Sequence, residues 1–173
     1  MPIMILTARL QLIPVDRKHI HAIQQGGDAL TALLGASIPA EWPHFPQAFA
    51  IPADDNPAFI QASLHWYGYL FVDHAQRALV GNGGFKGPPN ADGVVEIGYE
   101  IAPLFQNSGY ATEAAAAMIN FAFAVESVNA VAAHTLGAVN ASNRVLQKVA
   151  MRHISDVEHP GLGTLWAWQR ARN

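Results

Sequence analysis

Residues 105 to 118, FQNSGYATEAAAAM, join small polar residues and a glycine to a strong helix-forming sequence. Glu113 and the alanines after it favour a helix, and Asn107 or Ser108 suits its N-cap. Gly109 stands where a helix former would stabilise more, and it allows close approach to the backbone. The first N–H groups of a helix have no partner within it, so they and the helix dipole attract an anion. The stretch therefore predicts a phosphate-binding helix start, with a simple helix cap as the alternative.

The expected phosphate is one that is bound but not transferred. The N–H groups of residues 107 to 111 and the hydroxyl of Thr112 are the expected donors. The stretch lacks the lysine of a nucleotide-hydrolysing phosphate loop, and no G-x-G-x-x-G follows a first parallel strand. Binding therefore fits better than phosphoryl transfer.

The elements around this helix follow from hydrophobic periodicity and turn residues. Alternation in residues 5 to 14 predicts a strand, and Asp16 is expected to cap a helix that ends near Gly26. Three β-rich runs between residues 65 and 103 predict an antiparallel meander. The other expected elements are helix 28–34, an irregular loop 38–57, a helix opening at 56–57 and running through 62, strand 129–136, helix 140–151 and strand 162–170. This order predicts an α+β fold, with helices on a mixed, largely antiparallel sheet.

Composition bounds the class of protein. The 173 residues suit one domain, 1–173. The charged fraction of 13% is low, so part of the surface could form a subunit contact, and the expected state is a monomer or a homodimer. A net charge of −3 gives no reason to expect nucleic-acid or membrane binding. The absence of cysteine excludes disulfides, thiolate metal sites and a cysteine nucleophile, and the histidines show no metal-ligand spacing, so no metal is expected. Without a signal or membrane-spanning pattern, we expect a cytoplasmic protein.

The chain resembles the GNAT superfamily of acetyl-CoA-dependent N-acetyltransferases, and within it the RimJ/RimL-like branch. The pyrophosphate signature of that family, Q/R-x-x-G-x-G/A, stands here as Gln106-Asn107-Ser108-Gly109-Tyr110-Ala111. LTARLQLIP is similar to the opening strand of the branch and EIGYEIAP to its fourth strand. GYATEAAAAMINFAF, AAHTLGAVNASNRVLQKVAM and LWAWQR resemble its central helix, its next strand and helix, and its end. The resemblance follows family order over nearly the whole chain.

The resemblance implies a GNAT fold, whose mixed, mostly antiparallel sheet has about six to seven strands and is splayed between its fourth and fifth strands. It implies acetyl-CoA as co-substrate, with the pantetheine arm near Ile101 and Ala102 and the pyrophosphate on residues 106 to 112. Asn140 would help to hold the pantetheine. Many members protonate the leaving thiolate with a tyrosine, which residues 140 to 151 lack, so Ser142 is the candidate acid. For Asn140 and Ser142 a plain N-cap role is the alternative.

The implied reaction also needs a base, because an α-amino group has a pKa of about 8 and a lysine amine about 10.4. Glu96 is the first candidate, because the resemblance implies that its strand faces the thioester. Glu100 is the second, because it has the same parity on that strand, and the alternative is that at least one of the two carboxylates simply faces solvent. Trp42 and Trp66 are candidates for the acceptor pocket, or ordinary core residues.

The predicted function is transfer of an acetyl group from acetyl-CoA to a primary amine, by direct attack in a ternary complex. The acceptor is a protein N-terminus or a small-molecule amine, and the sequence does not select between them. One alternative is a non-catalytic acyl-CoA-binding or sensing module of the same fold. The other is an unrelated nucleotide-binding α/β protein with a chance Q-x-x-G-x-A.

Overall fold

The computed structural model describes residues 3–46, 66 and 68–172. The described strands form one sheet in the order β1-β2-β3-β4-β5-β6-β8-β7, in which only the β5–β6 pair is parallel. The strands are β1 (Ile5–Leu6), β2 (Leu10–Pro14), β3 (Gly68–Asp73), β4 (Ala78–Phe85), β5 (Val94–Ile101), β6 (Ala130–Leu136), β7 (Arg152–His159) and β8 (Gly163–Ala171). The helices are α1 (Arg17–Gln25), α2 (Gly27–Leu34), α4 (Tyr110–Phe123) and α5 (Ala141–Lys148), with a 3-10 turn η2 (Pro103–Phe105) before α4.

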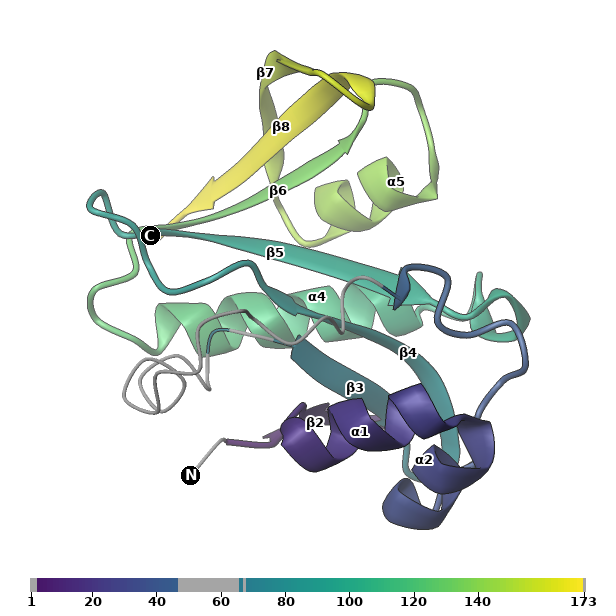
Figure 1. Cartoon of the computed structure of the whole chain (residues 1–173). Helices are drawn as coiled ribbons and strands as arrows, with labels where there is room; N and C mark the ends of the chain where they lie inside the picture. Colours follow the sequence, from purple (N-terminus) through teal and green to yellow (C-terminus); the bar gives the residue numbers. More distant parts are fainter. Residues whose placement is uncertain (1–2, 47–65, 67, 173) are drawn as a thin grey trace.

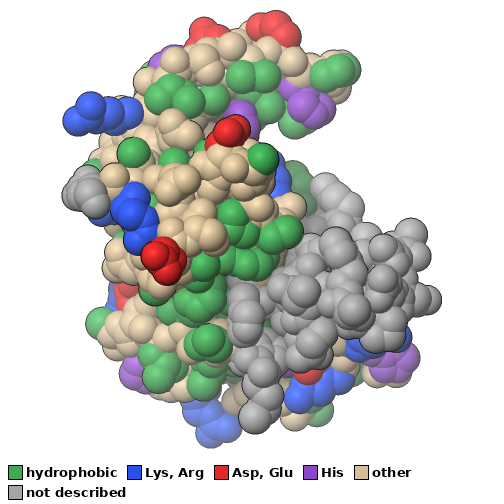
Figure 2. Space-filling model, turned by 90° about the vertical axis from the view of Figure 1, so that its left-hand side faces the viewer, with side chains coloured by type: hydrophobic (Ala, Val, Ile, Leu, Met, Phe, Trp, Pro, Cys, Tyr) green, Lys and Arg blue, Asp and Glu red, His purple; other side chains and the backbone are tan. Residues whose placement is uncertain are grey.

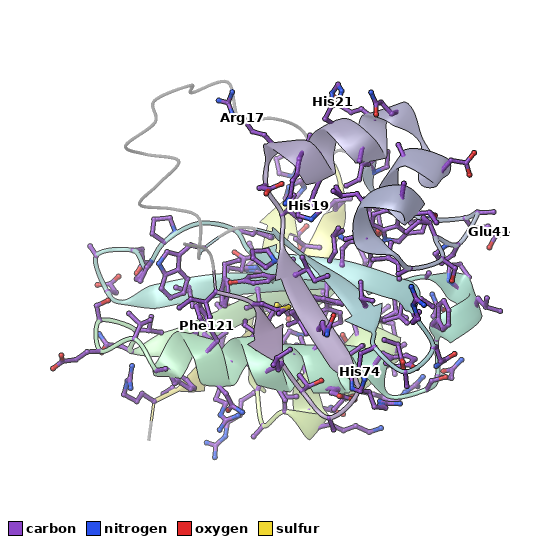
Figure 3. All side chains as sticks on the ribbon, turned by 90° about the horizontal axis from the view of Figure 1, so that it is seen from below. Arg17, His19, His21, Glu41, His74 and Phe121 are labelled. Carbon is purple, nitrogen blue, oxygen red and sulfur yellow. The ribbon has the colours of Figure 1, made fainter. Side chains whose placement is uncertain are left out.

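Local sequence explains where the first helix begins. The side chain of Asp16 accepts a hydrogen bond from the backbone N–H of His19 at 3.1 Å, which confirms the predicted N-cap of α1. His19 is buried between α1 and the sheet, whereas Arg17 and His21 point away from the sheet (Figure 3). Gly26 then ends α1 with a positive φ of 117°.

Helices cover both faces of the sheet, and a separate apolar cluster lies on each face (Figure 1). The larger cluster packs α4 and α5 on one face, around Phe71, Ile97 and Met118. The smaller packs α1 and α2 on the other face, around Leu30 and Leu70. Figure 2 shows a face of the molecule on which hydrophobic side chains form a band and charged ones are few, in keeping with the low charged fraction. The helix and strand order confirms the predicted α+β fold.

The sheet opens between β5 and β6. These strands pair only from Val94 to Glu96 of β5 with Ala130 to Ala132 of β6, although β5 runs on to Ile101. Figure 1 shows the two strands close at one end and diverging toward the other. Since the predicted fourth and fifth strands are β5 and β6, the expected splay is confirmed, and it leaves one edge of β5 unpaired beside α5.

Three details differ from the expectation. The predicted strand 5–14 is two strands, because the Thr7 hydroxyl and backbone both bond Leu10 and turn the chain between them. The strand β7 was not predicted, since all its residues are exposed and it shows no buried stripe; with it the sheet has eight strands. The predicted helix opening at 56–57 and most of the 38–57 loop lie outside the described residues. Across the described part of the chain, no helix is long and apolar enough to cross a membrane.

Candidate active site

A cavity of about 520 Å³ lies where the sheet opens. Its walls are the 41–45 segment, the end of β5, η2, the start of α4 and one side of α5. Eleven of the predicted site residues line it: Trp42, Glu100, Ile101, Ala102, Gln106, Asn107, Gly109, Tyr110, Ala111, Thr112 and Ser142. Four do not: Glu96, Trp66, Ser108 and Asn140. The splay therefore brings most of the predicted residues around one space.

The start of α4 has the conformation of an anion site. Gly109 is its N-cap with φ 83°, and Asn107 has φ 60°, so two left-handed residues curl the backbone just before the helix. No side chain of the described residues caps this helix end, which leaves the first N–H groups of the helix available to a ligand. Ser108 is occupied locally, because its hydroxyl donates to the carbonyl of Gln106 at 3.3 Å. The backbone of residues 107 to 112 thus forms an uncapped helix start whose N–H groups face no side-chain acceptor among the described residues.

Arg9 holds this helix start against the first hairpin. Its Nε donates to Oε2 of Glu113 at 2.7 Å, and its Nη1 donates to the carbonyl of Ser108 at 3.0 Å. The guanidinium also lies over the ring of Tyr110, 4.3 Å from the centroid. The role of Arg9 was not predictable from the sequence, because a contact across about a hundred positions leaves no local signal.

Tyr110 is fixed by a second set of polar contacts. Its hydroxyl donates to Oδ2 of Asp73 at 2.7 Å and accepts from Nε2 of Gln76 at 2.7 Å. Asp73 is buried at the end of β3, just before the turn to β4. The side chain of Tyr110 is therefore structural, and only its backbone is free for the cofactor role that the motif predicts.

These buried contacts predict acid sensitivity. Burial alone would raise the pKa of Glu113 above its ordinary 4.5, but the bonds from Thr7 and Arg9 outweigh it and lower the pKa. Hydrogen bonds from Gln76, Tyr110 and Ala75 likewise outweigh burial and lower the pKa of Asp73 from 3.8. Each group binds its proton more weakly in the folded chain, so its stabilisation is present above its unfolded pKa and is lost as pH falls through the lower, folded value.

We therefore expect the free energy of unfolding, measured by urea denaturation between pH 3 and pH 7, to fall below about pH 4.5. Glu113→Gln should be less stable at pH 7 and should show a shallower fall in acid. Asp28→Asn is the control, because that carboxylate is exposed and forms no hydrogen bond with a described residue. An unchanged acid slope in Glu113→Gln contradicts the assignment.

The two candidate bases have opposite surroundings, although they share one face of β5. The Glu100 carboxylate lines the cavity and accepts hydrogen bonds from the backbone N–H groups of His44 at 3.3 Å and Phe45 at 3.2 Å. Burial raises the pKa of Glu100, and those two bonds offset it only in part. Glu100 therefore has the raised pKa expected of a base.

Glu96 is held in a cluster outside the cavity. It accepts a hydrogen bond from the ammonium of Lys86, and one of its oxygens is 2.9 Å from Nδ1 of His134. Burial alone would raise the pKa of Glu96, but Lys86 and His134 outweigh it and lower the pKa. A general base works best when its pKa is raised toward the operating pH, and the pKa is raised for Glu100, the second candidate, and lowered for Glu96, the first.

Asn140 and the two tryptophans have defined structural contacts. Oδ1 of Asn140 accepts from the N–H of Asn143 at 3.0 Å, so Asn140 is the N-cap of α5, as the alternative reading expected. Nε1 of Trp42 donates to Oδ1 of Asn82 at 2.7 Å, beside the cavity. Trp66 packs in the core, with its ring centroid 5.0 Å from that of Phe85. Of the two, only Trp42 is placed to meet an acceptor.

The backbone near the end of β5 is partly occupied. The N–H of Ala102 donates to the carbonyl of Val80 at 2.9 Å, and its carbonyl accepts from Phe105 at 2.8 Å. The carbonyl of Ile101 accepts from Nε2 of Gln106 at 3.0 Å and keeps a second lone pair. A pantetheine arm along this edge would therefore find a free acceptor site on the carbonyl of Ile101 rather than on the backbone of Ala102.

Charge is divided across the cavity. Glu41 and Glu100 lie on the side of the 41–45 segment, and Arg144 and Lys148, one helical turn apart on α5, line the cavity as well. Neither cation has an ion pair with another described residue. Within the described ranges no three histidine or carboxylate side chains are placed to hold a metal ion. The cavity suits a polyanion beside α4 and α5 and a cation beside Glu100.

A sheet that opens beside an uncapped central helix, over a cavity with a half-buried carboxylate, is the arrangement that the resemblance to coenzyme A-dependent acetyltransferases implies. The chain belongs to the GNAT acetyltransferases, because the family model described as acetyltransferase (GNAT) domain matches residues 9–152. GNAT acetyltransferases use acetyl-CoA, and this chain is an acetyltransferase of that family.

Named relatives agree with this assignment. The chain is 26% identical over 148 residues to YjdG of Bacillus subtilis, an uncharacterised N-acetyltransferase, covering 85% of this chain and 88% of that protein. Its fold is similar to that of RimL, a ribosomal L7/L12 α-N-protein acetyltransferase in complex with coenzyme A, with a TM-score of 0.71, 17% identity and 98% of both chains covered. An acetyltransferase of Salmonella typhimurium that modifies the N-terminal serine of ribosomal protein L7/L12 gives a TM-score of 0.67 at 15% identity, over 96% of this chain and 97% of that one.

Proposed function

We propose that the chain transfers the acetyl group of acetyl-CoA to a primary amine by direct attack within a ternary complex. The observation that carries the proposal is the single cavity that joins the open start of α4 to the carboxylate of Glu100 and the hydroxyl of Ser142. A cofactor bound along the splay would present its thioester between these two groups. The absence of cysteine from the sequence agrees with direct transfer, since no thiol can carry the acetyl group.

The residues present fit coenzyme A. The N–H groups of residues 107 to 112 would bind the pyrophosphate with help from the dipole of α4. Arg144 and Lys148 supply positive charge on the opposite wall of the same cavity. The cofactor, when bound, supplies the activated acetyl group; the chain supplies its position and the proton transfers.

Glu100 is the proposed base. An amine in water carries a proton at neutral pH, and it must lose that proton before it can attack. The Glu100 carboxylate, with its raised pKa, would accept it directly or through a water molecule. The backbone N–H groups of His44 and Phe45 hold the carboxylate in place, so its orientation depends on the 41–45 segment.

The acceptor end of the cavity favours a cationic amine. Glu41 and Glu100 are both acidic, and Trp42 offers an apolar wall between them. The likeness to RimL supports a protein N-terminus as the acceptor, in a chain of the RimJ/RimL-like branch. A small-molecule amine is the other candidate, because the same charges would attract it.

Thiol release from acetyl-CoA, followed with a panel of peptides and small amines, tests the proposal. We expect at least one class of primary amine to raise thiol release above the rate with acetyl-CoA alone, with mass spectrometry showing one acetyl group on the amine. Tight coenzyme A binding without turnover of any amine would instead support the non-catalytic acyl-CoA-binding module. Peptides with free and blocked N-termini form the matched pair that separates α-amine acceptors from lysine acceptors.

A further inference from the structure

Tyr99 carries a buried hydroxyl that the fold leaves without a partner. Among the described residues, two buried side-chain oxygens lack a hydrogen-bond partner, Oη of Tyr99 and Oδ1 of Asn143, and of these two residues only Tyr99 lines the cavity. Buried polar groups in proteins are almost always paired, so an unpaired one in a binding cavity points to a hydrogen bond that forms only when the cavity is occupied. The ring itself packs against the core cluster around α4, which fixes where the hydroxyl points.

Ser142 is the neighbour of that hydroxyl. Burial raises the pKa of Tyr99, while the nearby Ser142 hydroxyl opposes this, although the two do not reach hydrogen-bond geometry in the free chain. Tyr99 comes from β5 and Ser142 from the first turn of α5, so the two hydroxyls lie on opposite walls of the splay. Ser142 is held there by the Asn140 cap of its helix.

We propose that Tyr99 is a positioning residue that donates a hydrogen bond to Oγ of Ser142 and so directs the Ser142 hydroxyl hydrogen at the sulfur of coenzyme A. The inference rests on the proposed function. A serine hydroxyl rotates freely. When another group donates a hydrogen bond to one of the lone pairs of the serine oxygen, the hydrogen of the serine hydroxyl can point only in the remaining directions. Because burial raises the pKa of Tyr99, its hydroxyl keeps its proton and can donate it in a hydrogen bond. Two linked hydroxyls also stabilise negative charge on sulfur more than one does.

Binding of coenzyme A and of desulfo-coenzyme A tests this without any acceptor amine. Isothermal titration calorimetry at pH 9, where most of a free thiol of pKa about 8.5 is ionised, gives the ratio of the two Kd values, which isolates the contribution of sulfur. We expect coenzyme A to bind about tenfold more tightly than the desulfo form to the wild-type chain, as for one hydrogen bond to a charged group. Tyr99→Phe should reduce that ratio to about threefold and Ser142→Ala to about one. The double variant should match Ser142→Ala.

Stability and rate separate positioning from a structural role. Tyr99→Phe removes only an unpaired buried hydroxyl, so its melting temperature should equal or exceed that of the wild type. Its kcat for a turned-over amine should nevertheless fall about tenfold while the KM for acetyl-CoA stays within about twofold. In the Ser142→Ala background the same change should cost nothing further, because Tyr99 acts through Ser142.

The outcomes are distinct. If the ratio of the Kd values for desulfo-coenzyme A and coenzyme A is unchanged in Tyr99→Phe, or is one in the wild-type chain, this inference is overturned and the proposed function is left intact. Failure of the wild-type chain to bind coenzyme A at all overturns both. The coupled pair is supported if the ratio of the two Kd values falls in Tyr99→Phe and the double variant has the same ratio as Ser142→Ala.

Discussion

Glu100→Gln is expected to lower kcat for amine acetylation by about 10²- to 10³-fold, the usual contribution of a general base. An amide has nearly the shape of the carboxylate but cannot accept a proton at neutral pH. The amide oxygen can still accept from one of the two N–H groups, those of His44 and Phe45, while the other loses its acceptor, so the 41–45 segment keeps one of its two bonds to this side chain. The Kd for coenzyme A, measured by calorimetry, should therefore remain within about twofold of the wild-type value, since the proposed phosphate-binding helix start is untouched.

Glu96→Gln is the matched control, because Glu96 lies on the same face of the same strand but outside the cavity. It loses the charge that pairs with Lys86 and His134, so a loss of stability is expected, with kcat within about fivefold of wild type. The reverse result, a large loss of kcat in Glu96→Gln and a small one in Glu100→Gln, would return the role of base to the first candidate of the sequence analysis.

The pH dependence gives an independent check. A base must be deprotonated to act, so kcat/KM should fall as pH drops through the pKa of Glu100, which burial raises above its ordinary 4.5. In Glu100→Gln this limb of the profile should disappear, leaving only the titration of the amine. A profile with the same acid limb in both proteins contradicts the assignment of Glu100.

The part of the site that lies in one continuous stretch was predictable from the sequence. Residues 106 to 112 combine a local motif, a local glycine conformation and a helix start, and the structure places six of these seven around the cavity. The strand before them and the helix after them were predicted from periodicity for the same reason. Local sequence determines local backbone, and the phosphate-binding geometry is a property of backbone.

The different surroundings of Glu96 and Glu100 were not predictable, because they depend on neighbours distant in the chain. Strand parity placed both carboxylates on one face, but Lys86 and His134 reach only Glu96, and the 41–45 segment reaches only Glu100. The contacts of Arg9 were not predicted for the same reason. Strand β7 was not predicted because all its residues are exposed, so its sequence has no alternating apolar pattern. Such features follow from tertiary contacts, which the local pattern of a single sequence does not show.

Gly81→Ala is expected to destabilise the fold by about 3 kcal/mol, which is large for one methyl group. Gly81 lies on β4 opposite Ile101 of β5, and a Cβ built on it would stand 2.2 Å from the carbonyl oxygen of Glu100 and 3.0 Å from Cα of Ile101. Both are backbone atoms in a paired strand, so no side-chain rotation relieves the overlap. The strands must separate locally, and the melting temperature should fall by roughly 6 to 12 °C for a chain of this length.

Gly98→Ala is the control that makes this a test of close strand approach rather than of glycine itself. Gly98 lies on β5 between Glu96 and Glu100, pairs with Gly84 of β4, and has open space where its Cβ would stand. Alanine there reduces the conformational freedom of the unfolded chain without a clash, so the melting temperature should stay level or rise slightly. Because the Gly81 overlap displaces the backbone of Glu100 itself, Gly81→Ala should also lose acetylation at temperatures where it remains folded. Equal melting temperatures for the two alanine variants would contradict the close pairing of β4 and β5 that holds the proposed base over the cavity.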